Sequence, residues 1–231
     1  MGINKTLKEI LKLREDISQY VYHFTKNRNA KDILERILCD RAIKDVKRNK
    51  YICFTEAPIT MLPSMFRLFK KYADPMYAPY GVGIRKDYLY NLGGRPVIYG
   101  TSDEKKKLPK ELQWRFVPMY PDSYDFGWLR EWRIPAGQID LTYENCFAVV
   151  DTKRDFDVLQ DLFFELDDIE IDSQPEDGGV LTEYTGYFSR KFKAVTMEEI
   201  EEVNNMSKQQ LEDILSQQVE QYGCSLGSIW E

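Results

Sequence analysis

The chain has 231 residues, of which 43% are hydrophobic and 13% aromatic, and this composition excludes an intrinsically disordered protein. The formal net charge of −6 argues against sequence-independent binding to nucleic acid or to an anionic membrane. Since no segment resembles a secretion signal and no apolar run approaches the ~18 residues of a membrane span, we expect a cytoplasmic protein without membrane contact.

The residue types that usually bind transition metals are scarce and scattered. Cys39, Cys53, Cys146 and Cys224 form no C-x-x-C pair, and His23 is the single histidine. We therefore expect buried, reduced thiols and no dedicated metal site.

The N-terminal part predicts a helix followed by a strand. Residues 5–18 carry Leu7, Ile10, Leu11 and Ile17 at helical spacing. Residues 20–25 are aromatic and β-branched, which favours a strand with Val21, His23 and Thr25 on one face and Tyr20, Tyr22 and Phe24 on the other.

Two further helices and a strand are expected before residue 76. Asn29 is a suitable N-cap for a helix whose apolar stripe is Ile33, Leu34, Ile37 and Leu38. Residues 51–55 predict a strand that stops at Pro58, and Pro63 can open a helix that ends before Pro75.

The middle of the chain predicts many short strands. Residues 77–99 favour two strands joined by a turn at residues 91–94, with a helical turn at residues 86–90. Residues 104–110 indicate a charged loop, and extended segments are expected at 114–119, 126–134 and 146–151.

The last third has a different character. Residues 161–176 are strongly acidic, and Thr196 to Glu199 and Ser207 to Gln210 each match a capping box before a helix. No internal repeat or long linker divides the chain, so we expect a single domain over residues 1–231.

Three segments carry candidate functional residues. His23 and Thr25 lie near the end of a strand, where side chains can meet a ligand, although a lone histidine is more often structural. Glu131 lies in Trp128-Leu-Arg-Glu-Trp-Arg133, where it can line a cleft or form a cross-strand ion pair. Thr55 and Glu56 follow a strand in Cys53-Phe-Thr-Glu-Ala-Pro58, where they can reach a pocket or cap a turn.

A His-x-Thr strand followed by a helix, an aromatic middle and a late strand with one glutamate resembles the ADP-ribosyltransferase superfamily. The resemblance covers roughly residues 20–150, is nearest to the histidine, aromatic, glutamate branch, and extends to abortive-infection and phage-defence proteins. It implies an α+β fold of mixed, mostly antiparallel split sheets with short helices, in which residues 20–150 form the transferase-like core and residues 151–231 an acidic, partly helical extension.

The resemblance also implies a set of roles around NAD. His23, with Phe24, Thr25 and Thr55 beside it, would hold a ribose, and Glu131 would accept a hydrogen bond from the ribose 2′-hydroxyl across adjoining strands. Tyr77, Tyr80 or Tyr99 would stack on nicotinamide. Arg133, Arg130 or Arg28 would neutralise the pyrophosphate through bidentate contacts.

The sequence departs from the family pattern at one informative position. Position 129, two residues before Glu131, is Leu, whereas arginine-modifying branches place Gln or Glu there. We therefore expect a macromolecular acceptor, protein or nucleic acid, that is not modified on arginine.

Three functions remain open from the sequence. The first is NAD-dependent ADP-ribosyl transfer by a bacterial toxin or phage-defence effector, with a neutralising antitoxin or defence-system partner. The second is a non-catalytic nucleotide- or protein-binding sensor with the same fold. The third, which the sequence supports less, is a nuclease with Mg²⁺ on Glu56, Asp122, Asp125 and Glu131.

Overall fold

A computed structural model describes residues 6, 10, 14, 16–45, 50–123, 125–162, 166–176, 179–188, 192–207, 209–211 and 213–214. For residues 160–162, 166–176 and 179–188 it describes the backbone alone.

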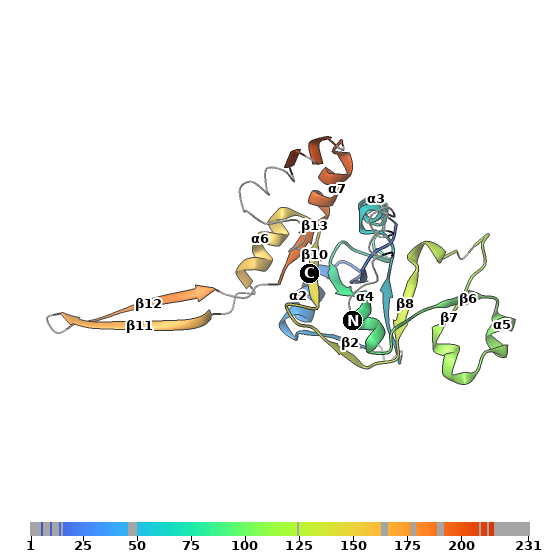
Figure 1. Cartoon of the computed structure of the whole chain (residues 1–231), viewed down its shortest axis with the longest axis horizontal. Helices are drawn as coiled ribbons and strands as arrows, with labels where there is room; N and C mark the ends of the chain where they lie inside the picture. The colour runs from blue at the N-terminus through green and yellow to red at the C-terminus, as the bar shows by residue number, and fades with distance from the viewer. Residues whose placement is uncertain are drawn as a thin grey trace.

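The body of the molecule is built on a seven-stranded sheet with the order β13-β10-β4-β1-β3-β8-β5 (Figure 1). All its neighbours are antiparallel except β10 and β13, which run parallel. Its strands, in chain order, are β1 (Tyr20–Phe24), β3 (Ile52–Thr55), β4 (Gly81–Arg85), β5 (Arg95–Pro96), β8 (Glu131–Ile134), β10 (Cys146–Val150) and β13 (Ala194–Thr196).

Six further strands form three separate two-stranded sheets. They pair as β2 (Ala42–Lys44) with β9 (Gln138–Asp140), β6 (Ile98–Gly100) with β7 (Phe116–Pro118), and β11 (Leu166–Glu176) with β12 (Gly179–Phe188). Figure 1 shows β11 and β12 as an arm that extends away from the body.

The helices are short and lie around the sheet. The α-helices are α2 (Ala30–Cys39), α3 (Leu62–Phe69), α4 (Lys86–Asn91), α5 (Ser102–Lys107), α6 (Lys153–Leu162) and α7 (Met197–Asn205). Three 3-10 helices are η1 (Ile59–Met61), η2 (Lys110–Arg115) and η3 (Gly127–Leu129). The expected α+β class, with a mixed, mostly antiparallel sheet and short helices, is confirmed.

Alternation along the strands gives the sheet two faces with separate cores. The larger core holds Val21, Phe54, Val82 and Trp132 with the buried stripe of α2. The smaller core, on the opposite face, is centred on Tyr22 and Phe66. The predicted period of two in the first strand is therefore what separates the two cores.

Glycines in β4 make room for the aromatic rings on the smaller-core face. A Cβ on Gly83 would lie 2.5 Å from the ring of Phe147, and one on Gly81 would lie 2.4 Å from the carbonyl oxygen of His23. Because those positions lack side chains, the rings of Tyr20, Tyr22 and Phe147 pack edge-to-face across the sheet.

The predicted helix starts agree with the structure, with one difference in chemistry. Asn29 occupies the N-cap position of α2 but its side chain forms no capping hydrogen bond, whereas Thr196 and Glu199 form the full capping box of α7. Ser207 and Gln210 also make both capping-box hydrogen bonds. Pro63 lies in the first turn of α3, as expected.

Three local predictions were wrong, and two others concern residues that lie largely outside the described part of the chain. Residues 104–107 are not part of a loop but of α5, which the capping box of Thr101 and Glu104 starts. Residues 127–129 are not extended but form η3. Cys39 is exposed instead of buried, and Cys224, like most of the expected helix over residues 5–18, lies outside the described residues.

The segment beyond residue 150 contributes more than helices. It supplies β13, which pairs with β10 at the edge of the central sheet, and the β11–β12 arm. Within the described part of the chain, no helix is both long enough and apolar enough to cross a membrane.

Candidate functional site

Glu131 begins β8 and lies directly opposite Thr55 of β3, and Thr55 in turn lies opposite Tyr22 of β1. Residues opposite one another in antiparallel strands share a face. We call this side the Glu131 face, which carries Tyr22, Phe24, Cys53, Thr55, Glu131 and Arg133. The other side, the His23 face, carries Val21, His23, Phe54 and Trp132.

Glu131 is a largely buried carboxylate held by one arginine. Its side chain is 13% exposed, and its Oε1 accepts a hydrogen bond of 2.8 Å from Nε of Arg133. Arg133 also donates to the carbonyl oxygens of Trp114 and Phe116, and its guanidinium lies 4.4 Å from the ring centre of Tyr51. These contacts fix the arginine, and the arginine fixes the carboxylate.

Three side chains around Glu131, those of Cys53, Tyr77 and Tyr99, have raised pKa values and stay protonated at neutral pH. Burial, followed by the negative charge of Glu131, raises the pKa of the Cys53 thiol to about 12 and that of the Tyr77 hydroxyl to about 12. The hydroxyl of Tyr99 accepts from the backbone N–H of Glu131 and donates to the carbonyl of Phe126. At neutral pH these neighbours are uncharged, so the ion pair of Glu131 with Arg133 dominates the local field.

An apolar cavity adjoins this group. It has a volume of about 10 Å³, room for about one water molecule, and five aromatic rings contribute to its wall. The lining residues are Phe24, Thr55, Leu62, Met65, Phe66, Phe69, Tyr77, Trp128 and Leu129. Three of the predicted cofactor-binding residues, Phe24, Thr55 and Tyr77, therefore come together here.

The turn before β8 explains why Trp128 reaches this cavity. Leu129 ends η3, and Arg130 adopts a left-handed conformation with φ 45°. The hydroxyl of Thr55 donates to the carbonyl of Leu129, and the backbone N–H of Glu56 also donates to it. Alternation over residues 128–133 is therefore interrupted, and the regular strand begins only at Glu131.

His23 lies on the opposite side of the sheet from Glu131. Its ring packs against Phe54 at 5.6 Å between ring centres, and Nδ1 donates to the carbonyl of Cys53 over 2.8 Å. Burial lowers the pKa of His23, so the ring is neutral at pH 7 with its proton on Nδ1. The expectation that His23 and Glu131 face each other is wrong, because β3 separates their strands and the alternation of β1 points them to different faces.

Two other predicted ligands have structural partners. The hydroxyl of Thr25, which is 4% exposed, lies within hydrogen-bond distance of the carbonyls of Ala30 and Tyr80 and joins the start of α2 to the segment before β4. The hydroxyl of Tyr80 donates to Asp155 at the first turn of α6. Neither residue lines the cavity beside Glu131.

The candidate arginines are also separated. Arg130 binds the backbone carbonyl and the carboxylate of Asp16, and Arg28 donates to the carbonyl of Ala73. Arg133 alone among the three contacts Glu131.

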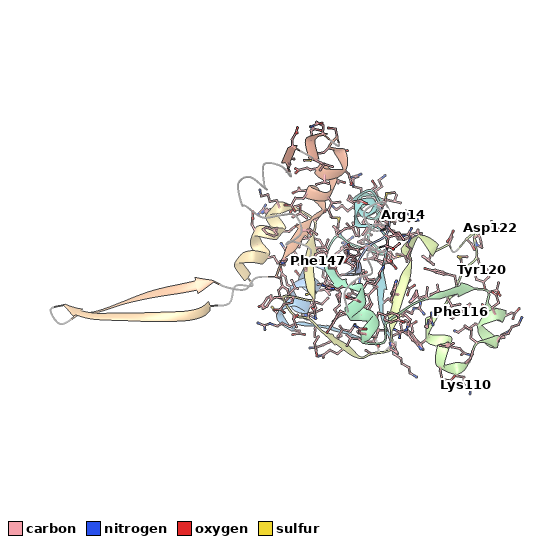
Figure 2. The ribbon with its side chains drawn as sticks, in the orientation of Figure 1. Arg14, Lys110, Phe116, Tyr120, Asp122 and Phe147 are labelled. Atoms are coloured by element: carbon pink, nitrogen blue, oxygen red, sulfur yellow. The ribbon has the colours of Figure 1, made fainter. Side chains whose placement is uncertain are left out.

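The expected Mg²⁺ ligands do not form one cluster: Glu56 and Glu131 lie on different faces of the sheet, and Asp122 lies at the outer edge of the molecule (Figure 2). Glu56 accepts hydrogen bonds from Lys86 and from the indole of Trp132, a residue of the His23 face, at 2.7 Å each. Glu131 lies on the other face, so these two carboxylates do not share a site. Within the described residues, no group of three or more His, Cys, Asp or Glu side chains is placed to hold a metal ion.

The contribution of α3 to the site was not predicted from the sequence. Met65, Phe66 and Phe69 line the cavity, yet in the sequence they read as an ordinary apolar helix stripe. Trp128 stood in the predicted strand beside Glu131, but its approach to Tyr77, at 6.2 Å between ring centres, depends on the η3 turn.

Comparisons of the chain with protein-family models, with curated proteins and with solved structures gave no match.

Proposed function

We propose that the chain transfers ADP-ribose from NAD to a macromolecular acceptor, with Glu131 as the catalytic anion and the Glu131 face as the site. The observation that carries the proposal is a fixed, 13% exposed carboxylate next to an aromatic-lined cavity that contains Phe24, Thr55 and Tyr77. The resemblance in the sequence supplies the choice of NAD.

The chemistry requires a negative charge at one point. When the bond between the ribose carbon and nicotinamide breaks, nicotinamide leaves with the electron pair and positive charge develops on the ribose. A preorganised carboxylate in a site of low polarity stabilises that charge, and an acceptor nucleophile then bonds to the carbon and loses its proton.

The proposal needs the cavity to open. At about 10 Å³ it admits a water molecule and no ring, so the side chains of Met65 and Trp128 would have to move to admit nicotinamide. Met65 is flexible, and Trp128 is 37% exposed at the surface end of η3.

His23 has a different role in this proposal from the one that the resemblance implies. It joins β1 to β3 through the Cys53 carbonyl and so positions the strand that carries Thr55. We expect substitution of His23 to act through stability and not through contact with NAD.

The test is release of nicotinamide from NAD by the purified chain in the presence of protein and nucleic-acid acceptor extracts. Glu131→Gln should lower turnover by roughly 10²- to 10³-fold, the range found when one stabilising group of a transition state is removed. Glu56→Gln is the matched control, because Glu56 is also a largely buried, ion-paired carboxylate, 17% exposed, on the other face. Equal activity of Glu131→Gln and wild type, or no release by wild type with any acceptor, would refute the proposal.

A second candidate, a non-catalytic nucleotide-binding sensor, is favoured by one observation. Arg133 already neutralises Glu131 at 2.8 Å, which weakens the carboxylate as a stabiliser of new positive charge. A sensor of this kind would gain thermal stability with NAD while releasing no nicotinamide, and Glu131→Gln would leave its biological effect unchanged.

A further inference from the structure

A second, larger cavity lies between α3, the end of β10 and α7, away from Glu131. Its volume is about 220 Å³, smaller than the usual pockets for drug-sized ligands. The residues around it are Pro63, Phe66, Arg67, Lys70, Asp151, Thr152, Met197, Glu198 and Glu201.

Opposite walls of this cavity carry side chains of opposite charge. Both cations come from the α3 side, Arg67 from the helix and Lys70 from its C-cap, whereas the anions Asp151, Glu198 and Glu201 come from the β10 end and α7. A ligand inside therefore experiences a field directed from one wall to the other.

Two ion pairs connect the walls. Lys70 Nζ lies 2.6 Å from Asp151, and Arg67 pairs with Glu201. Their side chains are largely exposed on the α3 side, at 54% for Lys70 and 58% for Arg67. Salt bridges between exposed groups contribute little to stability, so exchanging Glu201, whose side chain is 37% exposed, for the carboxylate of a ligand costs little.

Apart from Thr152, the rest of the wall is apolar. Pro63, Phe66 and Met197 are each buried, and they offer a surface to a small hydrocarbon group. A suitable ligand thus has a positive group, a negative group and a short apolar part.

We propose that this cavity binds a small zwitterion of the α-amino acid class. The carboxylate of the ligand meets Arg67, whose planar guanidinium suits it, the ammonium group meets Asp151 and Glu198, and the apolar side chain lies against Phe66. An amine or a carboxylic acid alone satisfies one wall and leaves the other without its counter-charge.

The cavity is coupled to the aromatic one through α3. Residues 63, 66, 67 and 70 line the charged cavity, and residues 62, 65, 66 and 69 line the aromatic cavity. Both sets have the spacing of one helical stripe, and Phe66 belongs to both. A ligand that presses on Phe66 therefore changes the surroundings of Trp128 in the aromatic cavity.

Isothermal titration of the full chain with leucine, methionine and phenylalanine tests the site. Each amino acid is compared with its amide, which lacks the carboxylate, and with its des-amino acid. We expect at least one amino acid to bind at least tenfold more tightly than both of its analogues, and Arg67→Gln and Glu198→Gln each to weaken that binding tenfold or more. Lys106→Gln, on the exposed helix α5, is the control that leaves binding unchanged.

Two results would overturn the proposal: no amino acid of the panel binds wild type below about 10 mM, or the analogues bind as tightly as the parent. Thermal unfolding of each variant shows that it is folded. The link through Phe66 predicts a change in tryptophan fluorescence on binding that Trp128→Phe abolishes, and an unchanged spectrum with ligand bound would refute that link. Since the readout is binding, the result is independent of NAD turnover.

Discussion

The two faces of the central sheet differ in what their polar residues do. On the His23 face, polar side chains bind other parts of the protein: Nδ1 of His23 donates to the Cys53 carbonyl, and Glu56 accepts hydrogen bonds from Lys86 and Trp132. On the Glu131 face, the ion pair of Glu131 and Arg133 lies beside a cavity lined by aromatic rings. Because successive side chains of a strand point to opposite faces, β8 carries the candidate functional residue Glu131 next to Trp132, which packs in the larger core.

The largest expected effect comes from adjacent residues of β3 on opposite faces. Phe54→Ala removes a ring that is 2% exposed in the larger core and leaves a cavity, so we expect a loss of about 3–5 kcal/mol in the free energy of unfolding. Cys53→Ala, on the half-buried Glu131 face, should lose about 1 kcal/mol. Urea denaturation measures both, and similar losses at the two positions would contradict the assignment of faces.

A smaller loss is expected where β4 approaches β1. Gly81→Ala places a Cβ 2.4 Å from the His23 carbonyl oxygen, so backbone must shift at a cost of about 1–3 kcal/mol. The matched control is Gly137→Ala, since a Cβ there has no atom within 4 Å, and it should change stability by less than about 0.5 kcal/mol.

His23 provides a pH test of its own face. Burial lowers its pKa in the folded state, so the unfolded chain binds the proton more readily and stability falls as pH decreases below about 6.5. The slope cannot exceed about 1.4 kcal/mol per pH unit for one proton. Unfolding free energies of wild type and His23→Gln between pH 5 and 8 should converge as the pH falls, and parallel curves would show that His23 is not shielded.

Tyr99 gives the smallest effect, on the Glu131 face. Tyr99→Phe removes a hydroxyl that binds the Glu131 N–H and the Phe126 carbonyl, and we expect a loss of about 0.5–1.5 kcal/mol. Thermal unfolding measures the loss. A loss as large as that of Phe54→Ala would contradict the prediction, because two hydrogen bonds would not account for it.

The sequence predicted the elements better than their assembly. Periodicity predicted the strand of His23 and the stripe of α2, and a capping-box motif predicted the start of α7, because each depends on neighbours within a few residues. The capping box of Thr101 and Glu104 was also visible in the sequence, but the charged run after it favoured a loop. Capping is a local signal that composition can hide.

Only part of the site was predicted from the sequence, because its assembly depends on how distant strands pair. Phe24, Thr55 and Tyr77 line one cavity. The face of the sheet to which Glu131 points, however, depends on the register of β8 with β3 and on the left-handed conformation of Arg130. Register is a long-range property, and a shift of one residue exchanges the faces. The separation of His23 from Glu131 could therefore be read only from the paired strands.

The edge strand β13 has a consequence for engineering. Chain order runs β10, α6, the β11–β12 arm and then β13, and β13 returns to pair in parallel with β10. The arm is thus an insertion within a strand–helix–strand crossover whose two strands are neighbours. Replacing residues 166–188 by a short flexible linker should leave the central sheet intact, which makes this position a natural site for a fused tag or reporter.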